Sequence, residues 1–520
     1  MTILVPLTIA ASCAIAIWFI KQLLVKQPLP NVPFLRICDK PGVPGDKDDV
    51  QAFLADSYSA LMKGYRKYNQ QGKHFLLRTP KQVFCMVAPS HIDEIRKAAP
   101  TKLSHKAAGN TIFQTSHTLH PALQDDQSHF QVVSRALTPA LNTQLMDLVD
   151  EAKIVFSEQI GEPKEWKNLN TWQSSFGMLG QVTNRLLATK ELCRDPEFVK
   201  WSASYSKSIF GGAVLVRNYP KFLRTLAMYW WTDVAEKKAT ARKYFMPIIK
   251  ERLQAEALYK AQGRLAEWNK IKSQDSSKSL RFNNRNPEIL LYKAMHLNVT
   301  GVHTPCVVWV ELIHDLCRHP EIHDELRDEI AEVFSGVADG KWTKENLIKL
   351  VKLDSFIRES SRCSPLSAVK LERYAQSEYT LSDGTVIPKG SSVAVVAQGI
   401  QQDADRLPNP ELFDAFRYAR LRAEPGQENN WQWVTTSEIN LLFGHGKFAC
   451  PGRHVASAVE KIMMVLALAQ YDIRFVPGAP ATNGQWTQKF RNPDANAVVQ
   501  WKVRARESRF ANILGPVAEA

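Results

Sequence analysis

A single cysteine in a glycine-rich segment is the side chain of this sequence best suited to chemistry. Cys450 lies in the stretch Phe443-Gly-His-Gly-Lys-Phe-Ala-Cys-Pro-Gly-Arg453. Three glycines surround the cysteine: Gly444, Gly446 and Gly452. An apolar run with helical spacing follows from Val455, so the sulfur should lie at a helix N-terminus. Unpaired N–H groups and the helix dipole favour a thiolate there, which predicts a metal ligand.

Two threonines in a long apolar segment, Thr300-Gly-Val-His-Thr304-Pro305, could handle protons. Thr300 and Thr304 are four residues apart and share a helix face. Pro305 lacks an N–H and clashes with the carbonyl of Gly301, which predicts a kink with room for water. His303 could relay protons, because its ordinary pKa is about 6.5. The alternatives are a kink without chemistry and a core histidine that faces away.

A charged pair, Glu359 and Arg362, is spaced three residues apart in a helical pattern. Such residues lie side by side on a helix, and an exposed pair of this kind contributes little to stability. Arg417 follows in the stretch Pro410-Glu-Leu-Phe-Asp-Ala-Phe-Arg417.

Together, and in their order along the chain, these segments resemble the cytochrome P450 family of haem-thiolate monooxygenases. The family pattern Phe-x-x-Gly-x-Arg/His-x-Cys-x-Gly is matched at Phe443, Gly446, Cys450 and Gly452. The resemblance implies haem b with Cys450 as axial ligand, since a thiolate favours O–O cleavage at the iron. Phe448 stands where the family usually has a cation for a haem propionate, so another donor or water must serve that carboxylate.

The resemblance also implies roles for the other segments. Gly301 and Thr304 match the motif on the distal side of the haem, where His303 replaces the usual acid. Glu359 and Arg362 would join Arg417 in a structural charge network beneath the cysteine segment.

A fourth segment, His129 to Arg135 followed by Leu137-Thr-Pro139, resembles the helix that donates to the haem propionates. The family's Trp-x-x-x-Arg is absent from it. Arg135 is the candidate donor, and its alternative is a surface arginine.

The N-terminus predicts a membrane anchor. Residues 2–20 carry no charge, and about 20 such residues span a bilayer. Lys21 and Lys26 follow, which favours a cytoplasmic catalytic part. We expect a single transmembrane helix at 1–21, a Pro-rich linker at 22–34 and a catalytic domain at 35–520, in the endoplasmic reticulum membrane. A cleaved signal peptide is the rival interpretation, but the segment lacks a charged start.

The elements that must position these residues are mainly helical, with a smaller β component. A long helix is expected from Pro287 to about Arg318, opened by Asn286. Strands are expected at 74–78, 83–87 and 499–503, with a hairpin around Asp383-Gly384. Residues 100–128 are expected to form a long loop. The fold class is thus mainly α, the cytochrome P450 fold preceded by one transmembrane helix.

Composition limits the classes of binding partner and the redox compartment of this chain. The net charge is +14 without a run of five like charges, which argues against nucleic acid and suits an anionic membrane or an acidic partner protein. The eight cysteines include no Cys-x-x-Cys pair and no zinc spacing, which favours a reducing compartment.

The predicted function is oxidation of a lipophilic secondary metabolite with dioxygen. The cysteine segment, the His-Thr pair and residues 381–390 resemble fungal monooxygenases of terpenoid, indole-diterpene and gibberellin pathways, including mycotoxin pathways. The sequence contains no Gly-x-Gly-x-x-Gly, so electrons should come from a separate NADPH-dependent reductase, docked near Lys447 and Arg453. Trp230 and Trp231 could dip into the membrane or pack in the core. The rival functions are a haem-thiolate isomerase or dehydratase without dioxygen, and a non-catalytic haem protein.

Overall fold

The fold is seen in a computed structural model that describes residues 29, 31–38, 46–274, 285–337, 340–480 and 482–515. The predicted anchor at 1–21 and most of the predicted linker lie outside this range. Within it, no helix combines the length and apolarity needed to cross a bilayer.

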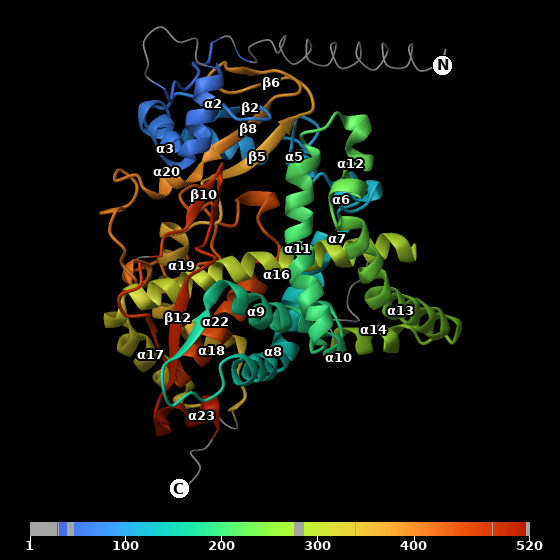
Figure 1. Cartoon of the computed structure of the whole chain (residues 1–520), viewed down its shortest axis with the longest axis vertical. Coiled ribbons are helices and arrows are strands. Elements are labelled where there is room, and N and C mark those ends of the chain that lie inside the picture. The colour runs from blue at the N-terminus through green and yellow to red at the C-terminus, as the bar shows by residue number, and fades with distance from the viewer. Residues whose placement is uncertain are drawn as a thin grey trace.

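One long helix, α16 (Pro287–Arg318), crosses the centre of the molecule (Figure 1). Its start is as predicted, because the Asn286 side chain accepts a hydrogen bond from the Glu288 N–H and Pro287 follows the cap. The helix continues through Pro305 as one element, and the kink expected there stays a prediction. Pro305 has no N–H to donate to the carbonyl one turn earlier. In the same turn the Thr304 hydroxyl donates a side-chain hydrogen bond to the Thr300 carbonyl at 2.8 Å.

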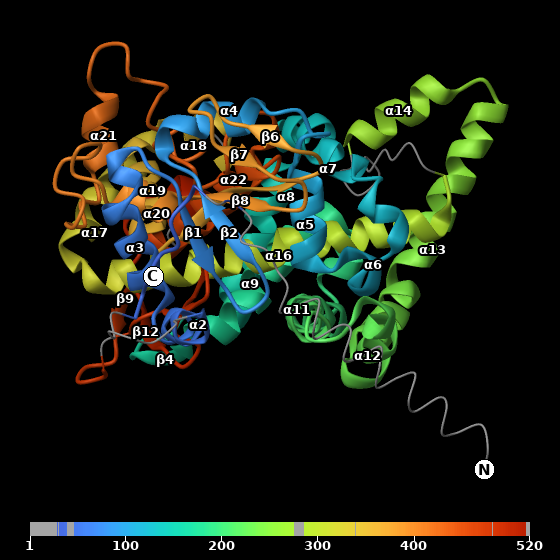
Figure 2. The ribbon, with the colours of Figure 1, turned by 90° about the horizontal axis from the view of Figure 1, so that it is seen from above.

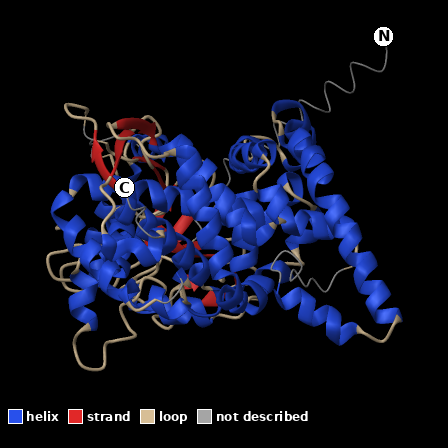
Figure 3. Cartoon of the chain, turned by 90° about the horizontal axis from the view of Figure 1, so that it is seen from below, coloured by secondary structure: helices blue, strands red, loops and turns tan. Residues whose placement is uncertain are grey.

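Helices make up most of the remaining structure (Figure 3). They are α2 (Asp46–Ala55), α3 (Ser57–Lys67), α4 (Ile92–Lys97), α5 (His105–Phe113), α6 (Thr115–Thr118), α7 (Ser128–Val132), α8 (Thr138–Gln159), α9 (Thr171–Leu187), α10 (Lys190–Cys193), α11 (Pro196–Val216), α12 (Arg224–Trp231), α13 (Val234–Ala261), α14 (Leu265–Gln274), α17 (His323–Ser335), α18 (Lys344–Lys349), α19 (Val351–Cys363), α20 (Ala397–Gln401), α21 (Arg417–Arg422), α22 (Arg453–Gln470) and α23 (Ala511–Leu514).

The strands form one larger sheet and three small ones. The five-stranded sheet has the order β1 (Phe75–Arg78), β2 (Val83–Met86), β8 (Ser392–Val396), β5 (Val369–Ala375) and β3 (Leu103–Ser104). The three-stranded sheet has the order β4 (Lys167–Asn170), β12 (Val498–Val503) and β9 (Tyr471–Phe475). Two hairpins pair β6 (Tyr379–Thr380) with β7 (Val386–Ile387) and β10 (Gln485–Thr487) with β11 (Phe490–Asn492). The strands and the hairpin expected from the sequence are confirmed.

The expected loop at 100–128 is wrong, because α5 and α6 occupy much of it. The Ser104 side chain accepts a hydrogen bond from the Ala107 N–H at 3.1 Å and so caps α5. A local cap of this kind starts a helix even in a segment rich in polar residues.

Two parts of the core hold the centre in place. One packs α16 against α8, α9, α19 and α22, and includes the buried residues Trp309, Phe356 and Ile462. The other lies under the five-stranded sheet and includes Phe75 and Val395. Figure 1 shows the sheet on one side of α16 and helices α8, α9 and α22 on the other, and in Figure 2, seen from above, the strands lie in front of these helices. The cysteine segment immediately precedes α22 and so belongs to this centre.

Candidate active site

A tight turn delivers Cys450 to the start of α22. The Cys450 N–H donates to the Phe443 carbonyl at 2.7 Å, which closes the loop between them. Gly444 and Gly446 have φ values of 71° and 72°, a left-handed conformation that glycine adopts without strain. The sequence-predicted glycines thus shape the loop that presents the sulfur.

Cys450 is exposed to solvent. The protein atoms packed around its sulfur still desolvate the thiolate form, and this desolvation raises the pKa of the thiol. The backbone N–H groups of Gly452 and Arg453 and the charges of Arg453 and Lys370 act in the opposite direction. The Arg453 guanidinium also donates to the Cys450 carbonyl at 2.8 Å. These donors would stabilise a thiolate once a metal replaces the proton.

Two cations, Arg373 and Lys447, lie beside Phe448, the position where a cation was expected and is missing. The guanidinium carbon of Arg373 lies 5.3 Å from the centre of the Phe448 ring, and the His105 ring lies 5.4 Å from it. Arg373 is buried, and its Nε and Nη2 find no partner among the described residues. Burial lowers the pKa of Arg373 to about 10. Its Nη1 donates to the Glu372 carbonyl at 2.9 Å, so two nitrogens of this buried guanidinium remain that suit an anion from outside the chain.

Sequence reasoning missed Arg373 and His105. Each stands alone in the sequence, without a partner at helical or strand spacing. Only the pairing of β5 with the sheet brings Arg373 to Phe448.

On α16, Thr300 and Thr304 face the same side, as predicted. Thr304 is exposed although Val302, Pro305 and Cys306 next to it are buried, so it lies on the open side of α16. Both hydroxyls donate to helix carbonyls, that of Thr300 to His296 at 3.0 Å.

The other two predicted residues of this motif point elsewhere. An added Cβ on Gly301 would lie 3.2 Å from Leu187 Cδ1 on α9, so close helix packing accounts for this glycine. The His303 ring is 5.0 Å from Phe210 and 6.0 Å from Trp172. Burial among these rings lowers the pKa of His303 to about 4, which matches a neutral core histidine better than a proton relay.

The structure brings Glu359, Arg362 and Arg417 together. The carboxylate of Glu359 accepts from Arg362 at 2.7 and 2.8 Å and from Arg417 at 3.2 Å. Glu359 is fully buried. The two guanidiniums also donate to carbonyls of the segment before α21, including those of Pro410 and Leu412. The network therefore fixes this segment to α19.

A tryptophan links the network to the cysteine loop. The Trp433 indole N–H donates to Ser361 Oγ on α19 at 3.1 Å, and its backbone N–H donates to Asp354 at 2.8 Å. The Trp433 and Phe443 ring centres are 5.1 Å apart in an edge-to-face contact. A disturbance of α19 would thus reach the loop that holds Cys450.

Arg135 lies in a π-helical turn, η4 (Val133–Leu137), and is exposed. No hydrogen bond or ion pair within the described ranges involves it. The turn itself abuts the site, since an added Cβ on Gly452 would lie 3.7 Å from Val133 Cγ1. The predicted segment is therefore next to the cysteine, but the structure gives Arg135 no contact there.

One group of three possible metal ligands occurs among the described residues: His74, His91 and Asp383. The Ala88 N–H donates to His74 Nδ1 at 3.0 Å, so a neutral ring carries its proton on Nε2, 2.9 Å from Asp383. A nitrogen that carries a proton cannot ligate a metal. The group is a hydrogen-bonded link between β1 and the β6–β7 hairpin.

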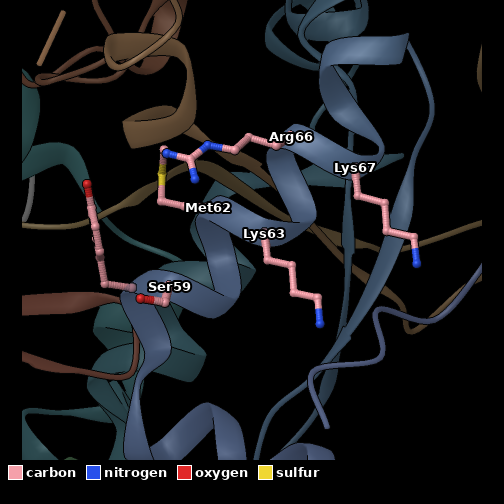
Figure 4. A pocket seen from close by; sticks show the side chains of 6 residues that line it. Ser59, Met62, Lys63, Arg66 and Lys67 are labelled. Carbon is pink, nitrogen blue, oxygen red and sulfur yellow. The ribbon is translucent and has the colours of Figure 1, made fainter. Parts of the chain in front are cut away.

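A surface pocket of about 580 Å³ lies along α3, away from the cysteine loop (Figure 4). Lys63 and Lys67 extend to one side of the helix and Arg66 to the other, next to Met62. Three of the residues that line this pocket are lysine or arginine, so its surface is positively charged, and it carries no group suited to catalysis.

The comparisons with known proteins agree with this geometry. The family model described as "Cytochrome P450" matches residues 53–500. Cytochrome P450 monooxygenase olcJ of Penicillium canescens is 31% identical over 80% of this chain and 78% of its own length. Cytochrome P450 monooxygenase AN1598 of Emericella nidulans is 28% identical over 86% of this chain and 83% of its own length.

The fold is similar to that of solved structures. The haem domain of cytochrome P450DA superposes with a TM-score of 0.64 at 13% identity, covering 92% of this chain and 98% of that one. The chain belongs to the cytochrome P450 family, and it is a monooxygenase of that family.

The residues present fit the haem of this family, whose axial ligand is a cysteine thiolate. Cys450 offers an exposed thiol just before a helix N-terminus, and Arg373 offers two buried nitrogens, Nε and Nη2, that no group among the described residues satisfies. A haem propionate is the kind of anion that these donors require.

Proposed function

We propose that this monooxygenase hydroxylates or otherwise oxidises a lipophilic secondary metabolite, of terpenoid or indole-diterpene type, with electrons from an NADPH-dependent reductase. The observation that carries the proposal is the accessible Cys450 sulfur in a closed loop at the start of α22, with unsatisfied cationic donors nearby. The bound haem would supply oxygen activation, and the chain would supply the ligand, protons and the position of the substrate.

Three parts of the predicted site have tasks under this proposal. Cys450 binds the iron through Sγ. Thr304 holds a proton at Oγ1 beside α16, where its hydrogen bond to the Thr300 carbonyl orients the hydroxyl, and a proton that it gives up would be replaced from water. Glu359, Arg362 and Arg417 hold the scaffold on which the cysteine loop rests.

The reductase is proposed to dock where the cysteine loop reaches the surface. Lys447 is exposed on the loop, and Arg453 lies at its end. Replacing Lys447 with Glu should slow reduction at low ionic strength and have less effect at high salt, because exposed charges are screened. Lys260→Glu, at the distant end of α13, is the matched control.

The chain is also proposed to be held at the endoplasmic reticulum membrane through residues 1–21, with the catalytic part in the cytosol. Support comes from α12 and the turn before it, where large apolar side chains are exposed: Phe222 (74%), Tyr229 (68%), Trp230 (66%) and Trp231 (63%). Aromatic side chains of this kind suit a membrane interface and a lipophilic substrate that arrives through it.

The test is expression of the full chain with a reductase and candidate terpenoid precursors, followed by product analysis. The reduced wild-type protein should give the carbon-monoxide band of a thiolate haem, and Cys450→Ser should lose it. Turnover without NADPH would point instead to an isomerase or dehydratase. Haem binding without any product would point to a non-catalytic protein.

A further inference from the structure

A cavity between the five-stranded sheet, α5 and the end of α11 combines apolar walls with cations. Helix α5 contacts both β5 and α11 and closes one side of the cavity (Figure 1). The large apolar side chains that line it are Phe53, Leu61, Leu77, Phe84, Met86, Ile112, Val369 and Phe490. The buried Arg373 marks its inner end, beside Phe448 of the cysteine loop. A lipophilic molecule that reaches the haem site through this cavity would lie along these apolar side chains.

Lys81 and Arg217 line the outer end of the cavity, on segments that are distant in sequence. Lys81 is exposed in the turn between β1 and β2, which the Thr79 N–H closes by donating to the Gln82 carbonyl at 3.0 Å. Arg217 is half-buried and directly follows α11. Its Nε donates to the Ala213 carbonyl at 3.1 Å, and no hydrogen bond or ion pair within the described ranges uses its other two nitrogens. Both cations can therefore take a ligand from outside the chain.

The positive charge of this outer end is not neutralised by the protein. Among the described residues, no carboxylate forms an ion pair with Lys81, Arg217 or the neighbouring Arg224. Burial and the charges of Arg217 and Arg224 lower the pKa of Lys81, and burial and the charge of Arg224 lower the pKa of Arg217. Glu372, the one acid among the described residues that line the cavity, is paired with Lys489. Like charges gathered in this way cost free energy, which an anionic ligand would offset.

We propose that the substrate is a lipophilic carboxylic acid, whose carboxylate binds Lys81 and Arg217 at the outer end of this cavity while its apolar body reaches inward. This inference rests on the proposed oxidation of a lipophilic compound and adds the ionised group that the compound carries. The planar guanidinium of Arg217 suits both oxygens of a carboxylate, and Lys81 adds a point charge. The carbon that is oxidised then lies at the end of the molecule remote from the acid.

The test measures the binding of four probes to the purified full-length haem protein: hexadecanoic acid, abietic acid and the primary alcohol that corresponds to each. Binding is read from the shift of the haem absorption band, which a molecule bound elsewhere on the protein would not cause. Each alcohol keeps the apolar body and lacks the charge, so the ratio of acid affinity to alcohol affinity isolates the contribution of the carboxylate. We expect the wild type to prefer at least one acid over its alcohol by about tenfold.

Two neutral variants locate the carboxylate. Arg217→Met should lower the acid-to-alcohol ratio about tenfold, and Lys81→Met about threefold, because Lys81 is exposed and water weakens its contribution. Arg217→Lys keeps the charge and should keep most of the preference. Lys260→Met, at the distant end of α13, is the matched control and should leave the ratio unchanged. A purely structural role of Arg217 would weaken the binding of acid and alcohol equally and leave the ratio as it is.

The proposal is overturned if the wild type prefers neither acid, or if the ratios of both neutral variants stay within about twofold of that of Lys260→Met. Weaker binding of these variants to phosphatidylserine vesicles, with an unchanged ratio, would assign the cations to lipid headgroups and would also overturn it. If the wild-type chain takes up no haem, the proposed function itself fails. A normal haem protein without a preference for acids would remove only the assignment of the acid.

Discussion

The guanidinium of Arg373 lies 5.3 Å from the centre of the Phe448 ring, where the family usually has a cation. The buried positive charge beside Phe448 thus comes from strand β5, whereas the exposed Lys447 of the cysteine loop lies 5.7 Å from the ring centre. A cation at residue 448 would stand next to Arg373 and repel it, which is one physical reason for an aromatic residue at that position.

Arg373→Met should weaken haem binding. The variant leaves the haem carboxylate without the only buried guanidinium that contacts Phe448 among the described residues, so haem should transfer to apomyoglobin at least about tenfold faster. Arg474→Met is the control, because that guanidinium stacks on Trp166 at the surface. Equal haem loss in the two variants would contradict the assignment.

Thr304→Ala should separate NADPH consumption from product formation. The Oγ1 on the open side of α16 would be lost, and positioned proton donors contribute about 10²-fold or more to such steps. We expect product per NADPH to fall at least about tenfold, with the carbon-monoxide spectrum unchanged. Thr304→Ser keeps the hydroxyl and should keep the yield. If the alanine variant matches the serine variant, Thr304 has no part in proton delivery.

Glu359→Gln should destabilise the protein strongly, because it leaves the guanidiniums of Arg362 and Arg417 buried without a counter-charge. The expected loss is about 3–5 kcal/mol in the free energy of unfolding, read from urea denaturation. The control is Glu267→Gln, whose partner Arg264 is exposed, and it should leave the urea midpoint unchanged. Coincident midpoints for the two variants would show that the network is not needed for stability.

Glu460→Gln should change how stability depends on pH. Glu460 is fully buried in α22, both its oxygens lack a partner in the described part of the chain, and burial raises its pKa well above the ordinary value. The folded state therefore holds a proton that the unfolded state releases above a pH of about 4.5, so this group costs stability as the pH rises.

The glutamine variant cannot ionise, so its melting temperature relative to wild type should increase between pH 5 and pH 8. Glu345→Gln, at an exposed position on α18, should shift equally at both values. A constant difference for Glu460→Gln would mean that the carboxyl finds a partner or water in solution.

The sequence alone determined the chemistry of the centre. The spacing around Cys450 predicted the loop, because glycines at fixed positions permit only a few backbone paths. Local signals also predicted the start of α16, since the Asn286 cap and Pro287 act within the first turn of the helix.

Only the tertiary structure decided which charges meet. Arg373 is unremarkable in the sequence, and only the pairing of β5 with β8, a strand some twenty residues later, brings it beside Phe448. The surroundings of His303 and Gly301 were likewise set by α9 and α11, whose approach no local pattern encodes. Spacing along the chain fixes local geometry, whereas burial and counter-charges come from segments that are distant in sequence.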